Sequence, residues 1–256
     1  VEQLNGTPLT IRTLDLGADK SNNSLNFEQL RSSTNPALGL RAVRLCLRDT
    51  DLFKTQLRAV LRTSARGPIR CLIPMLTNVQ EIRMVHALLE EARDELDRRG
   101  QAYDPQLPVG GMIEVPAAAL ALPDLARYLD FISVGTNDLL QYTLAADRGD
   151  EQVAHLYDLE HSGVIRLLAF IFRQADAHDL PVTVCGEVAG DRRFTRLLLA
   201  LGLREFSMYP GRLLEVKQVV RTTDIPSAQA ALRQWLEDAE EQSEKTLLHA
   251  LDESQR

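Results

Sequence analysis

Short apolar runs alternate with longer segments of helical periodicity along most of this chain, and this alternation restricts the possible folds more than any other feature. Six runs are predicted strands: 8–14, 70–76, 109–115, 130–135, 182–187 and 204–209. They lack strict two-residue alternation, which is typical of strands buried on both faces of a parallel sheet. The predicted helices between them include 79–99, 162–178 and 191–202, where apolar residues recur three and four positions apart.

Six strand–helix units in succession predict an α/β fold, either a (β/α)8 barrel or a doubly wound sheet. A barrel needs eight strands and commonly about 250 residues. If this chain of 256 residues forms a barrel, we expect the first two strands to be missing. The chain begins at Val1 rather than at a methionine, and we expect it to be a piece of a longer protein.

Two further segments stand apart from the predicted strand–helix units. Residues 16–37 are polar and rich in Asn and Ser, and a loop of that length in a compact domain is usually functional or mobile. Residues 227–256 are rich in Glu and Gln, with Trp235 and Leu236 as the largest apolar side chains. We expect this second segment to form a helical tail on the surface or facing a partner.

The bulk composition argues against several classes of protein. The formal net charge of −7 disfavours broad binding to nucleic acid or to an anionic membrane surface. No stretch approaches the roughly 20 consecutive apolar residues of a membrane span, and no signal peptide is visible. The three cysteines are odd in number and widely spaced, which predicts reduced thiols in a cytoplasmic setting.

Three short motifs at the ends of predicted strands carry the groups suited to chemistry. They are Gly-Met-Ile-Glu-Val-Pro at 111–116, Gly-Thr-Asn-Asp-Leu at 135–139 and Val-Cys-Gly-Glu at 184–187. Parallel α/β folds gather their active groups at the carboxyl ends of their strands. We therefore expect the three motifs to form one shared site.

The first two motifs offer oxygen ligands for a metal ion. Mg²⁺ is usually bound by one or two carboxylates, with water and substrate oxygens completing its octahedron, and Glu114 and Asp138 meet that requirement. Asn137 adds an amide donor, and the backbone amides at such a strand-to-helix turn suit phosphate oxygens. The alternative is structural: each acid caps a helix or pairs with a cation, and Asn-Asp forms an ordinary turn.

Several cations are candidates for binding an anionic substrate. Arg12 lies within an otherwise apolar strand, where an unpaired charge would be costly, although Asp15 could simply neutralise it. Arg148 follows the 135–144 segment closely, and a guanidinium binds phosphate or carboxylate in a bidentate manner. Arg41 is a weaker candidate because a solvated helix face explains it equally well. Lys20 is weaker still.

The cysteines divide into two groups. Cys46 and Cys71 are predicted to be buried as small apolar residues. Cys185 ends a strand at the expected active edge, where a thiol with an ordinary pKa of about 8.5 can donate a proton near neutral pH. The histidines, including His155 and His161, show no metal-ligand spacing, and we assign them no chemistry.

These motifs, read together, give the chain a family resemblance. The relevant stretches are RTLDLGADK (12–20), NPALGLRAVR (35–44), GGMIEVPAAA (110–119), DFISVGTNDLLQYTLAADRGD (130–150), VCGEVAGD (184–191) and EFSMYPGRLLEVK (205–217). The chain resembles the phosphoenolpyruvate-utilising enzymes. The sequence of these stretches is more similar to the enzyme I branch of the bacterial phosphotransferase system than to pyruvate–phosphate dikinases or phosphoenolpyruvate synthases.

The resemblance implies a fold and a set of site residues. It implies a (β/α)8 barrel over 1–221, lacking its first strands, with a helical tail over 222–256 packed on or beside it. Glu114 and Asp138 would hold Mg²⁺, and Cys185 would protonate the enolate carbon as pyruvate forms. The residues that would bind phosphoenolpyruvate are Arg12, Asn137, Asp138 and Arg148, with Arg41 and Lys20 as helpers.

The resemblance also implies an activity and partners. In the family, a histidine on a separate N-terminal domain receives the phosphoryl group and passes it to the carrier HPr, and the barrel domains form a homodimer. That histidine domain and the leading strands, which contribute a further substrate arginine, are not in this sequence. We therefore expect this chain alone not to complete the reaction. The alternatives are a synthase or dikinase domain, or a non-catalytic dimerisation or regulatory module.

Overall fold

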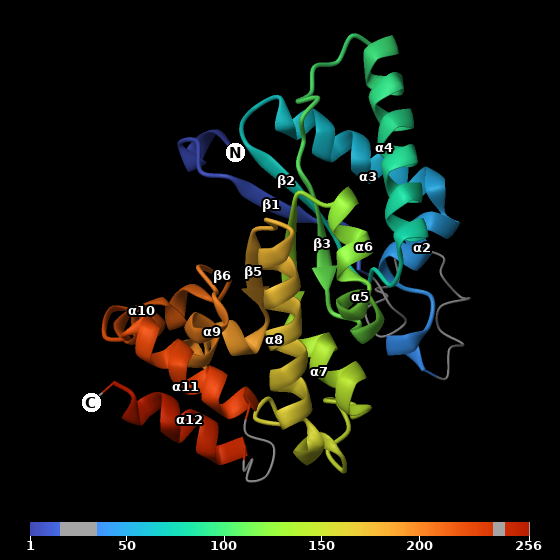
Figure 1. Cartoon of the computed structure of the whole chain (residues 1–256). Helices are drawn as coiled ribbons and strands as arrows, with labels where there is room; N and C mark the ends of the chain where they lie inside the picture. The colour runs from blue at the N-terminus through green and yellow to red at the C-terminus, as the bar shows by residue number, and fades with distance from the viewer. Residues whose placement is uncertain (16–34, 238–243, 256) are drawn as a thin grey trace. The chain divides into compact units, whose positions relative to one another are not determined.

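The computed structural model describes residues 1–15, 35–237 and 244–255, and it divides into two compact units (Figure 1). The first unit comprises Val1–Met112 and Asp124–Phe131, and the second comprises Ile113–Pro123 and Ile132–Arg256. Most of the polar stretch predicted at 16–37, including Lys20, lies outside the described residues. Within the described residues, no helix has both the length and the apolarity of a membrane span.

The first unit has parallel strands in chain order. Its strands are β1 (Leu9–Arg12), β2 (Ile69–Ile73) and β3 (Val109–Ile113, whose last residue belongs to the second unit). Its helices are α2 (Ala42–Arg48), α3 (Thr50–Ser64) and α4 (Val79–Arg98), with short 3-10 turns at Glu2–Leu4, Pro36–Leu38 and Ala126–Tyr128. Helix α3 packs against both β2 and α4.

Helix α4 shows why the predicted periodicity forms a helix here. Asn78 and Glu81 form a capping box, in which the Asn78 side chain accepts from the Glu81 N–H at 3.1 Å. Ile82, Val85 and Leu89 follow on one face and are buried, so cap and apolar stripe specify the same helix. The helix predicted at 79–99 is confirmed to within one residue.

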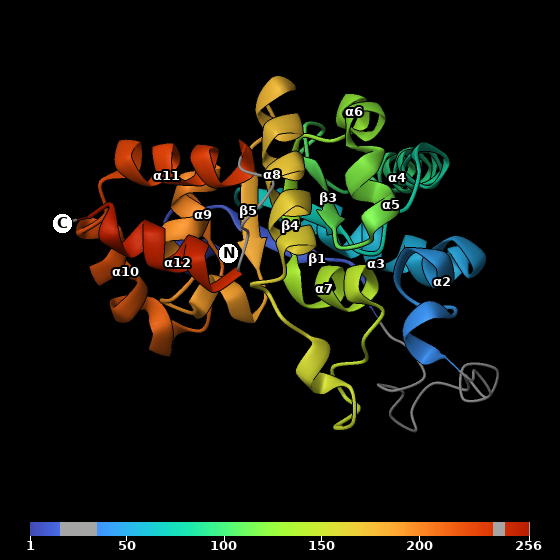
Figure 2. The same cartoon turned by 60° about the horizontal axis from the view of Figure 1, so that its bottom comes forward.

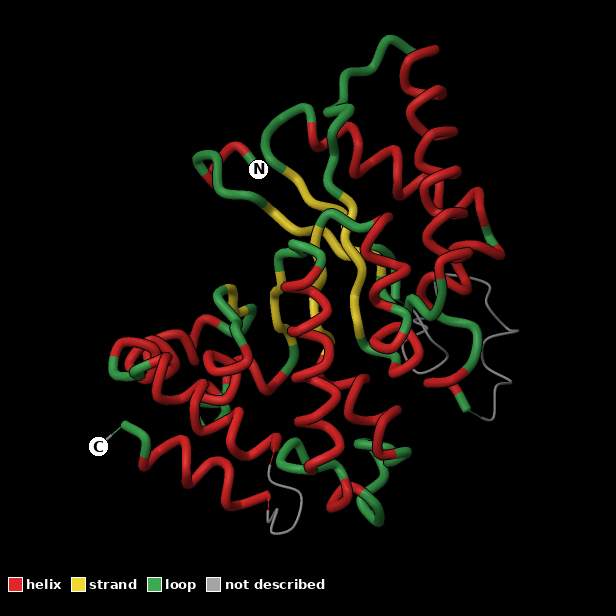
Figure 3. The backbone as a smooth tube through the Cα atoms, in the orientation of Figure 1, coloured by secondary structure: helices red, strands yellow, loops and turns green. Residues whose placement is uncertain are grey.

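The second unit repeats the parallel arrangement. Its strands, drawn yellow in Figure 3, are β4 (Phe131–Gly135, whose first residue belongs to the first unit), β5 (Val182–Cys185) and β6 (Glu205–Phe206). They are again parallel and in chain order. The helices are α5 (Pro116–Leu120), α7 (Thr136–Leu144), α8 (Ser162–Ala177), α9 (Thr195–Leu201), α10 (Leu213–Arg221), α11 (Ile225–Glu237) and α12 (Glu244–Glu253). The four-residue helix α6 (Leu122–Leu125) spans the boundary between the units, and 3-10 turns occupy Ala154–Leu156, Glu187–Gly190 and Pro210–Arg212.

The strand order confirms the predicted fold class. In neither unit does the order reverse, as it would at the switch point of a doubly wound sheet. The described residues contain six parallel strands, and consecutive parallel strands separated by helices are the arrangement of an incomplete (β/α)8 barrel. The strands are shorter than predicted, most clearly β6, which has two residues where 204–209 was expected.

The helix predicted at 191–202 begins later than its sequence pattern indicates. Residues before Thr195 form a turn around Asp191, whose carboxylate accepts from the backbone N–H and the guanidinium of Arg193. Local hydrogen bonds of this kind compete with helix formation, which explains the later start.

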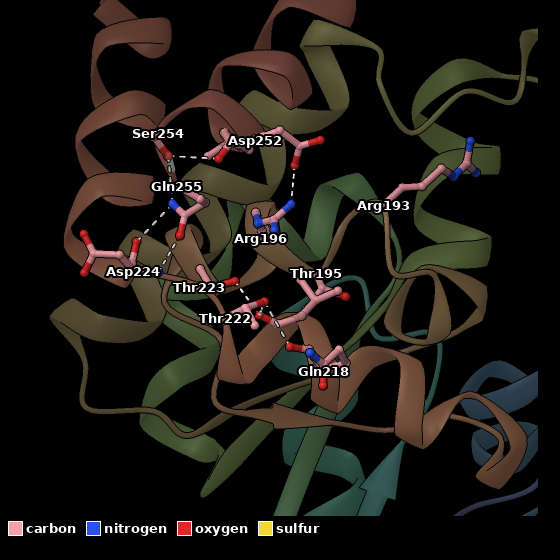
Figure 4. Close-up of polar contacts among 12 residues, drawn as sticks. Arg193, Thr195, Arg196, Gln218, Thr222, Thr223, Asp224, Asp252, Ser254 and Gln255 are labelled. Carbon is pink, nitrogen blue, oxygen red and sulfur yellow. Dashed lines mark hydrogen bonds and ion pairs between the residues drawn. The ribbon is translucent and has the colours of Figure 1, made fainter.

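The C-terminal segment packs on the second unit through α9. Helices α11 and α12 both contact α9 and each other, as Figures 1 and 2 show. Trp235 is buried, and the guanidinium of Arg166 lies over its ring at 5.5 Å. Arg196 of α9 forms an ion pair with Asp252 of α12, and Gln255 donates to the carbonyl of Asp224 at 3.3 Å (Figure 4). The domain boundary at 221/222 stays a prediction.

Candidate active site

The carboxyl ends of β4 and β5 lie side by side in the second unit. Gly135, the last residue of β4, is in register with Cys185, the last residue of β5. The Thr136 hydroxyl donates to the carbonyl of Cys185 at 2.9 Å and ties the two strand ends together. The motifs at 135–139 and 184–187 are therefore neighbours in space, although about fifty residues separate them in the sequence.

Cys185 is half-buried and has polar contacts on its sulfur. The Ser133 hydroxyl donates to Sγ at 3.3 Å, and Sγ contacts the carbonyl of Val134 at 3.5 Å. Cys46 and Cys71 are buried as predicted, and burial raises the pKa of each thiol to about 12. Of the three thiols, only Cys185 stands at the end of a strand and is partly accessible.

Asn137 is held by the turn that follows β5. Its side-chain Oδ1 accepts from the backbone N–H of Glu187 at 3.1 Å, so the Nδ2 amino group is the part of the amide that can donate to an anion. Gly186 allows the Thr136 and Asn137 side chains to lie this close to the turn after β5. Its φ is 99°, and a Cβ there would lie 2.5 Å from Thr136 Oγ1 and 2.8 Å from Asn137 Oδ1.

Asp138 lies in the first turn of α7 and is only 8% exposed. The partial positive charge of a helix N-terminus favours a carboxylate there. Ala145 ends the helix in the left-handed conformation, and the chain then turns back toward it. As a result, Arg148 lies close to the start of α7. Its Nη2 is 3.8 Å from Asp138 Oδ1, and its backbone N–H donates to Gln141 Oε1 at 3.4 Å.

Glu114 belongs to the same unit and directly follows β3. It is 3% exposed and precedes α5, which carries Pro116 at its first position as predicted. Helix α5 contacts α7, whose first turn holds Asp138. Among the described residues there is no cluster of three or more His, Cys, Asp or Glu side chains suited to a metal. Two carboxylates in one unit still match the way Mg²⁺ is usually held, with substrate and water as its remaining ligands.

Two of the predicted cations, Arg12 and Arg41, contact Asp15 in the first unit. Arg41 is buried, and its Nε and Nη2 donate to the two oxygens of Asp15 at 3.0 and 2.9 Å. The alternative of a solvated helix face for Arg41 is therefore wrong. Arg12 is the last residue of β1, its side chain is 46% exposed, and its Nη1 lies 3.5 Å from Asp15. Asp15 thus partly neutralises Arg12 while it orients Arg41 in a bidentate pair.

Tyr157 is a site residue that the sequence pattern did not reveal. Its hydroxyl donates to the backbone carbonyl of Asn137 at 2.9 Å. Burial raises the pKa of Tyr157 to about 12, the positive charge of Arg148 opposes that rise, and the carboxylates of Glu187 and Asp138 add to it. A tyrosine in a loop belongs to no motif, so only the folded arrangement places it here.

Comparison with known proteins identifies the family of this chain. The family described as PEP-utilising enzyme, PEP-binding domain, matches residues 1–225. The phosphoenolpyruvate-protein phosphotransferase of Cupriavidus necator is 51% identical over 245 residues, covering 95% of this chain and 42% of that protein. The proteins of the same name from Bacillus sp. (strain S) and Bacillus subtilis are 42% and 41% identical, covering 97% and 85% of this chain and 40% and 38% of their own lengths.

This chain therefore spans about two fifths of the length of these relatives. A crystal structure of a citrate lyase from Burkholderia xenovorans LB400 aligns with a TM-score of 0.49 and 19% identity, covering 79% of this chain and 68% of that one. The family match covers nearly the whole chain, and the relatives exceed 40% identity over most of it. The chain belongs to the PEP-utilising enzymes and is their PEP-binding domain, similar to that of the phosphoenolpyruvate-protein phosphotransferases.

Proposed function

We propose that this domain binds phosphoenolpyruvate with Mg²⁺ and serves a phosphotransferase of the enzyme I type. The observation that carries the proposal is the cluster at the ends of β4 and β5, where a thiol, an amide, a carboxylate and a guanidinium meet within one unit. These groups come from Cys185, Asn137, Asp138 and Arg148. The thiol suits the carbon that gains a proton, the amide and the guanidinium suit the anionic oxygens of an enol phosphate, and the carboxylate would help to hold Mg²⁺.

Glu114 and Asp138 are the residues that would hold Mg²⁺. Both are buried carboxylates, and hard oxygen donors of this kind fit Mg²⁺. A bound divalent cation would add to the interactions that stabilise these two carboxylates in a buried position. When bound, Mg²⁺ neutralises charge on the phosphate and on the enolate that forms.

Asn137 and Arg148 would bind the anionic oxygens of the substrate. The Nδ2 group of Asn137 supplies donors, and Arg148 supplies a planar cation that suits bidentate binding of phosphate or carboxylate. Transfer of a phosphoryl group depends mainly on alignment and charge neutralisation. Arg12, Arg41 and Lys20 stay predicted substrate ligands from the rest of the chain.

Cys185 would provide the proton that completes pyruvate. When the phosphoryl group leaves for the histidine of a separate domain, pyruvate enolate remains. The enolate electron pair forms a C–H bond with the Cys185 proton, the S–H bond breaks, and a thiolate remains. The Ser133 hydroxyl already donates to Sγ, and it would stabilise that thiolate.

The remaining elements of the proposal concern the whole protein. The relatives' name, phosphoenolpyruvate-protein phosphotransferase, supports a protein as the acceptor. We propose a histidine of a separate domain as the first acceptor and an HPr-type carrier as the next. We also propose a homodimer formed through this domain. The three free thiols support a location in the cytoplasm.

A thermal-shift and calorimetry experiment on this chain tests the proposal. Phosphoenolpyruvate or oxalate, a mimic of the enolate, should raise the melting temperature only in the presence of Mg²⁺. A ligand at one hundred times its Kd stabilises the folded state by about 2.7 kcal/mol. No shift with a folded sample at millimolar ligand would favour a non-catalytic dimerisation or regulatory module instead.

A matched pair of variants separates the site from general effects of charge. Arg148→Gln should weaken the ligand-induced shift because it removes the guanidinium beside Asp138. Arg193→Gln removes a guanidinium that is also paired with an aspartate, Asp191, in the same unit. Arg193→Gln should leave the ligand-induced shift in melting temperature unchanged. Equal losses in both variants would contradict the assignment of Arg148 to the binding site.

A further inference from the structure

We propose that Tyr157 is a positioning residue, which fastens the loop carrying Arg148 to Asn137 and so aligns both groups for the substrate anion. This inference rests on the proposed function, since it concerns the same binding site. Its basis is a single loop, residues 145–161, that leaves α7 and returns to α8. Arg148 and Tyr157 both lie on this loop and both contact the first two turns of α7.

Arg148 makes only weak contacts with α7, and its side chain also forms a hydrogen bond with the phenol of Tyr157. The Arg148 guanidinium lies 3.8 Å from the Asp138 carboxylate, and the Arg148 side chain is 43% exposed. The hydrogen bond from its backbone N–H to the Gln141 side chain is 3.4 Å long. Contacts of this length stabilise a loop only slightly. The Tyr157 contact is shorter, at 2.9 Å to the carbonyl of Asn137. The tyrosine is therefore the firmer of the two attachments between this loop and the start of α7.

Asn137 is fixed from two sides by these contacts. Its backbone carbonyl accepts from Tyr157, and its side-chain Oδ1 accepts from the N–H of Glu187. Two contacts, one on the main chain and one on the side chain, define where Nδ2 points. Groups held within about half an ångström of their working position are what substrate alignment requires.

Tyr157 also lies among the charges of the site. Arg148, Glu187 and Asp138 all act on its phenol electrostatically. Because its pKa is raised to about 12, the phenol stays protonated at every pH at which the protein is handled. Its hydroxyl is thus a permanent donor to Asn137, so the attachment does not depend on pH in the neutral range.

The test compares binding by this chain and its variants, measured by calorimetry with phosphoenolpyruvate and Mg²⁺. Tyr157→Phe keeps the ring and removes only the hydroxyl, and it should raise Kd about five-fold, the effect of losing one ordinary hydrogen bond. Tyr103→Phe is the matched control, since its hydroxyl donates to Asp97 at 3.0 Å within the first unit. The control should leave Kd unchanged, and melting curves without ligand verify that each variant is folded.

A double-mutant cycle distinguishes positioning from a general structural role. If Tyr157 acts by placing Arg148, then Tyr157→Phe should weaken binding much less in the Arg148→Gln background than in the parent. The same five-fold loss in both backgrounds would overturn the inference, and so would a parent-like Kd for the single variant. A parent chain that does not bind at all would instead overturn the proposed function.

Discussion

The hydroxyl of Ser133 donates a hydrogen bond to the sulfur of Cys185 at a distance of 3.3 Å. Ser133 is buried within β4, two residues before Gly135, the register partner of Cys185. The side chains of residues two apart on a strand point to the same face, so the hydroxyl reaches the thiol diagonally across the strand pair. A donor to sulfur favours the thiolate over the thiol, which is the state that Cys185 would reach after giving up its proton.

Proton transfer by Cys185 can be measured on this chain in the reverse direction. The same sulfur, as a thiolate, would remove a methyl proton from bound pyruvate, so the chain with Mg²⁺ should exchange those protons for deuterium. Cys185→Ala should slow the exchange by about a hundredfold or more, the usual contribution of a positioned acid or base. Proton NMR of pyruvate in D₂O follows the exchange.

The binding of oxalate provides the control for that experiment. Cys185→Ala should bind oxalate and Mg²⁺ as the parent does, because the thiol acts on carbon rather than on the anionic oxygens. Cys46→Ala, which removes a buried thiol of the first unit, should exchange at the parent's rate. An exchange rate for Cys185→Ala equal to that of the parent would remove the proton-transfer role.

The three thiols should differ in their reactivity toward iodoacetamide. Burial raises the pKa of Cys46 and Cys71 to about 12, so both stay almost entirely in the unreactive thiol form at pH 8. Cys185 is half-buried and should be alkylated first, as peptide mass spectrometry would show. Phosphoenolpyruvate with Mg²⁺ should slow its alkylation, and labelling of Cys46 before Cys185 would contradict the burial described here.

Gly186→Ala should destabilise the protein because glycine is the only residue suited to this turn. Its φ of 99° and ψ of −176° lie in a region almost restricted to glycine, and a Cβ would collide with Thr136 and Asn137. We expect a loss of about 3 kcal/mol in the free energy of unfolding, measured with urea. Gly211→Ala is the control, because no atom lies within 4 Å of the position that a Cβ would take there. Equal losses of stability in the two variants would contradict the close contact of Gly186 with Thr136 and Asn137.

The sequence was sufficient to predict the α/β class and the adjacency of the motifs at 135–139 and 184–187, for physical reasons. Buried parallel strands have a distinctive apolar pattern, and their carboxyl ends must share one edge, which is how Asn137 and Cys185 came to be predicted as neighbours. The contacts between Gly135, Thr136 and the end of β5 confirm that neighbourhood. The roles assigned to these residues stay predictions.

Other features could not be read from local pattern. For Arg41 the sequence left a ligand role and a solvated helix face equally open. Its partner Asp15 is 26 positions away, and only the fold brings the two together. Tyr157 likewise lies 20 residues after Asn137 in a loop whose path no periodicity encodes. Long-range pairs of this kind depend on tertiary packing, which overrides local propensity.

Asp191 should contribute to stability in a manner that depends on pH. Partial burial by itself would raise the pKa of Asp191, but the hydrogen bonds and charge of Arg193, with the charge of Arg212, outweigh it and lower the pKa. A lowered pKa in the folded state means that the contribution is present above the unfolded-state pKa and disappears as pH falls through the folded-state pKa. Asp191→Asn should therefore cost about 0.5 kcal/mol at pH 7, a small value because the Arg193 partner is solvent-exposed.

Urea unfolding at several pH values would measure this dependence. The difference between Asp191→Asn and the parent should vanish in acid, and it should also be small in an Arg193→Gln background, where the main partner is absent. A difference that stays constant from neutral pH into acid would mean that Asp191 acts through its backbone turn alone.

Trp235→Ala tests whether the C-terminal helices belong to the same folded unit as α9. Trp235 is 7% exposed, and Arg166 of α8 contacts its ring while donating to the carbonyl of Leu236 at 3.2 Å. Truncating a buried tryptophan usually costs about 3–5 kcal/mol, and we expect one cooperative urea transition shifted by that amount. Leu214→Ala, at a side chain that is 78% exposed, should change stability by less than about 0.5 kcal/mol. If Trp235→Ala left the main transition unchanged, the segment after residue 222 would be a separate tail, because its packing would then contribute nothing to the stability of the unit.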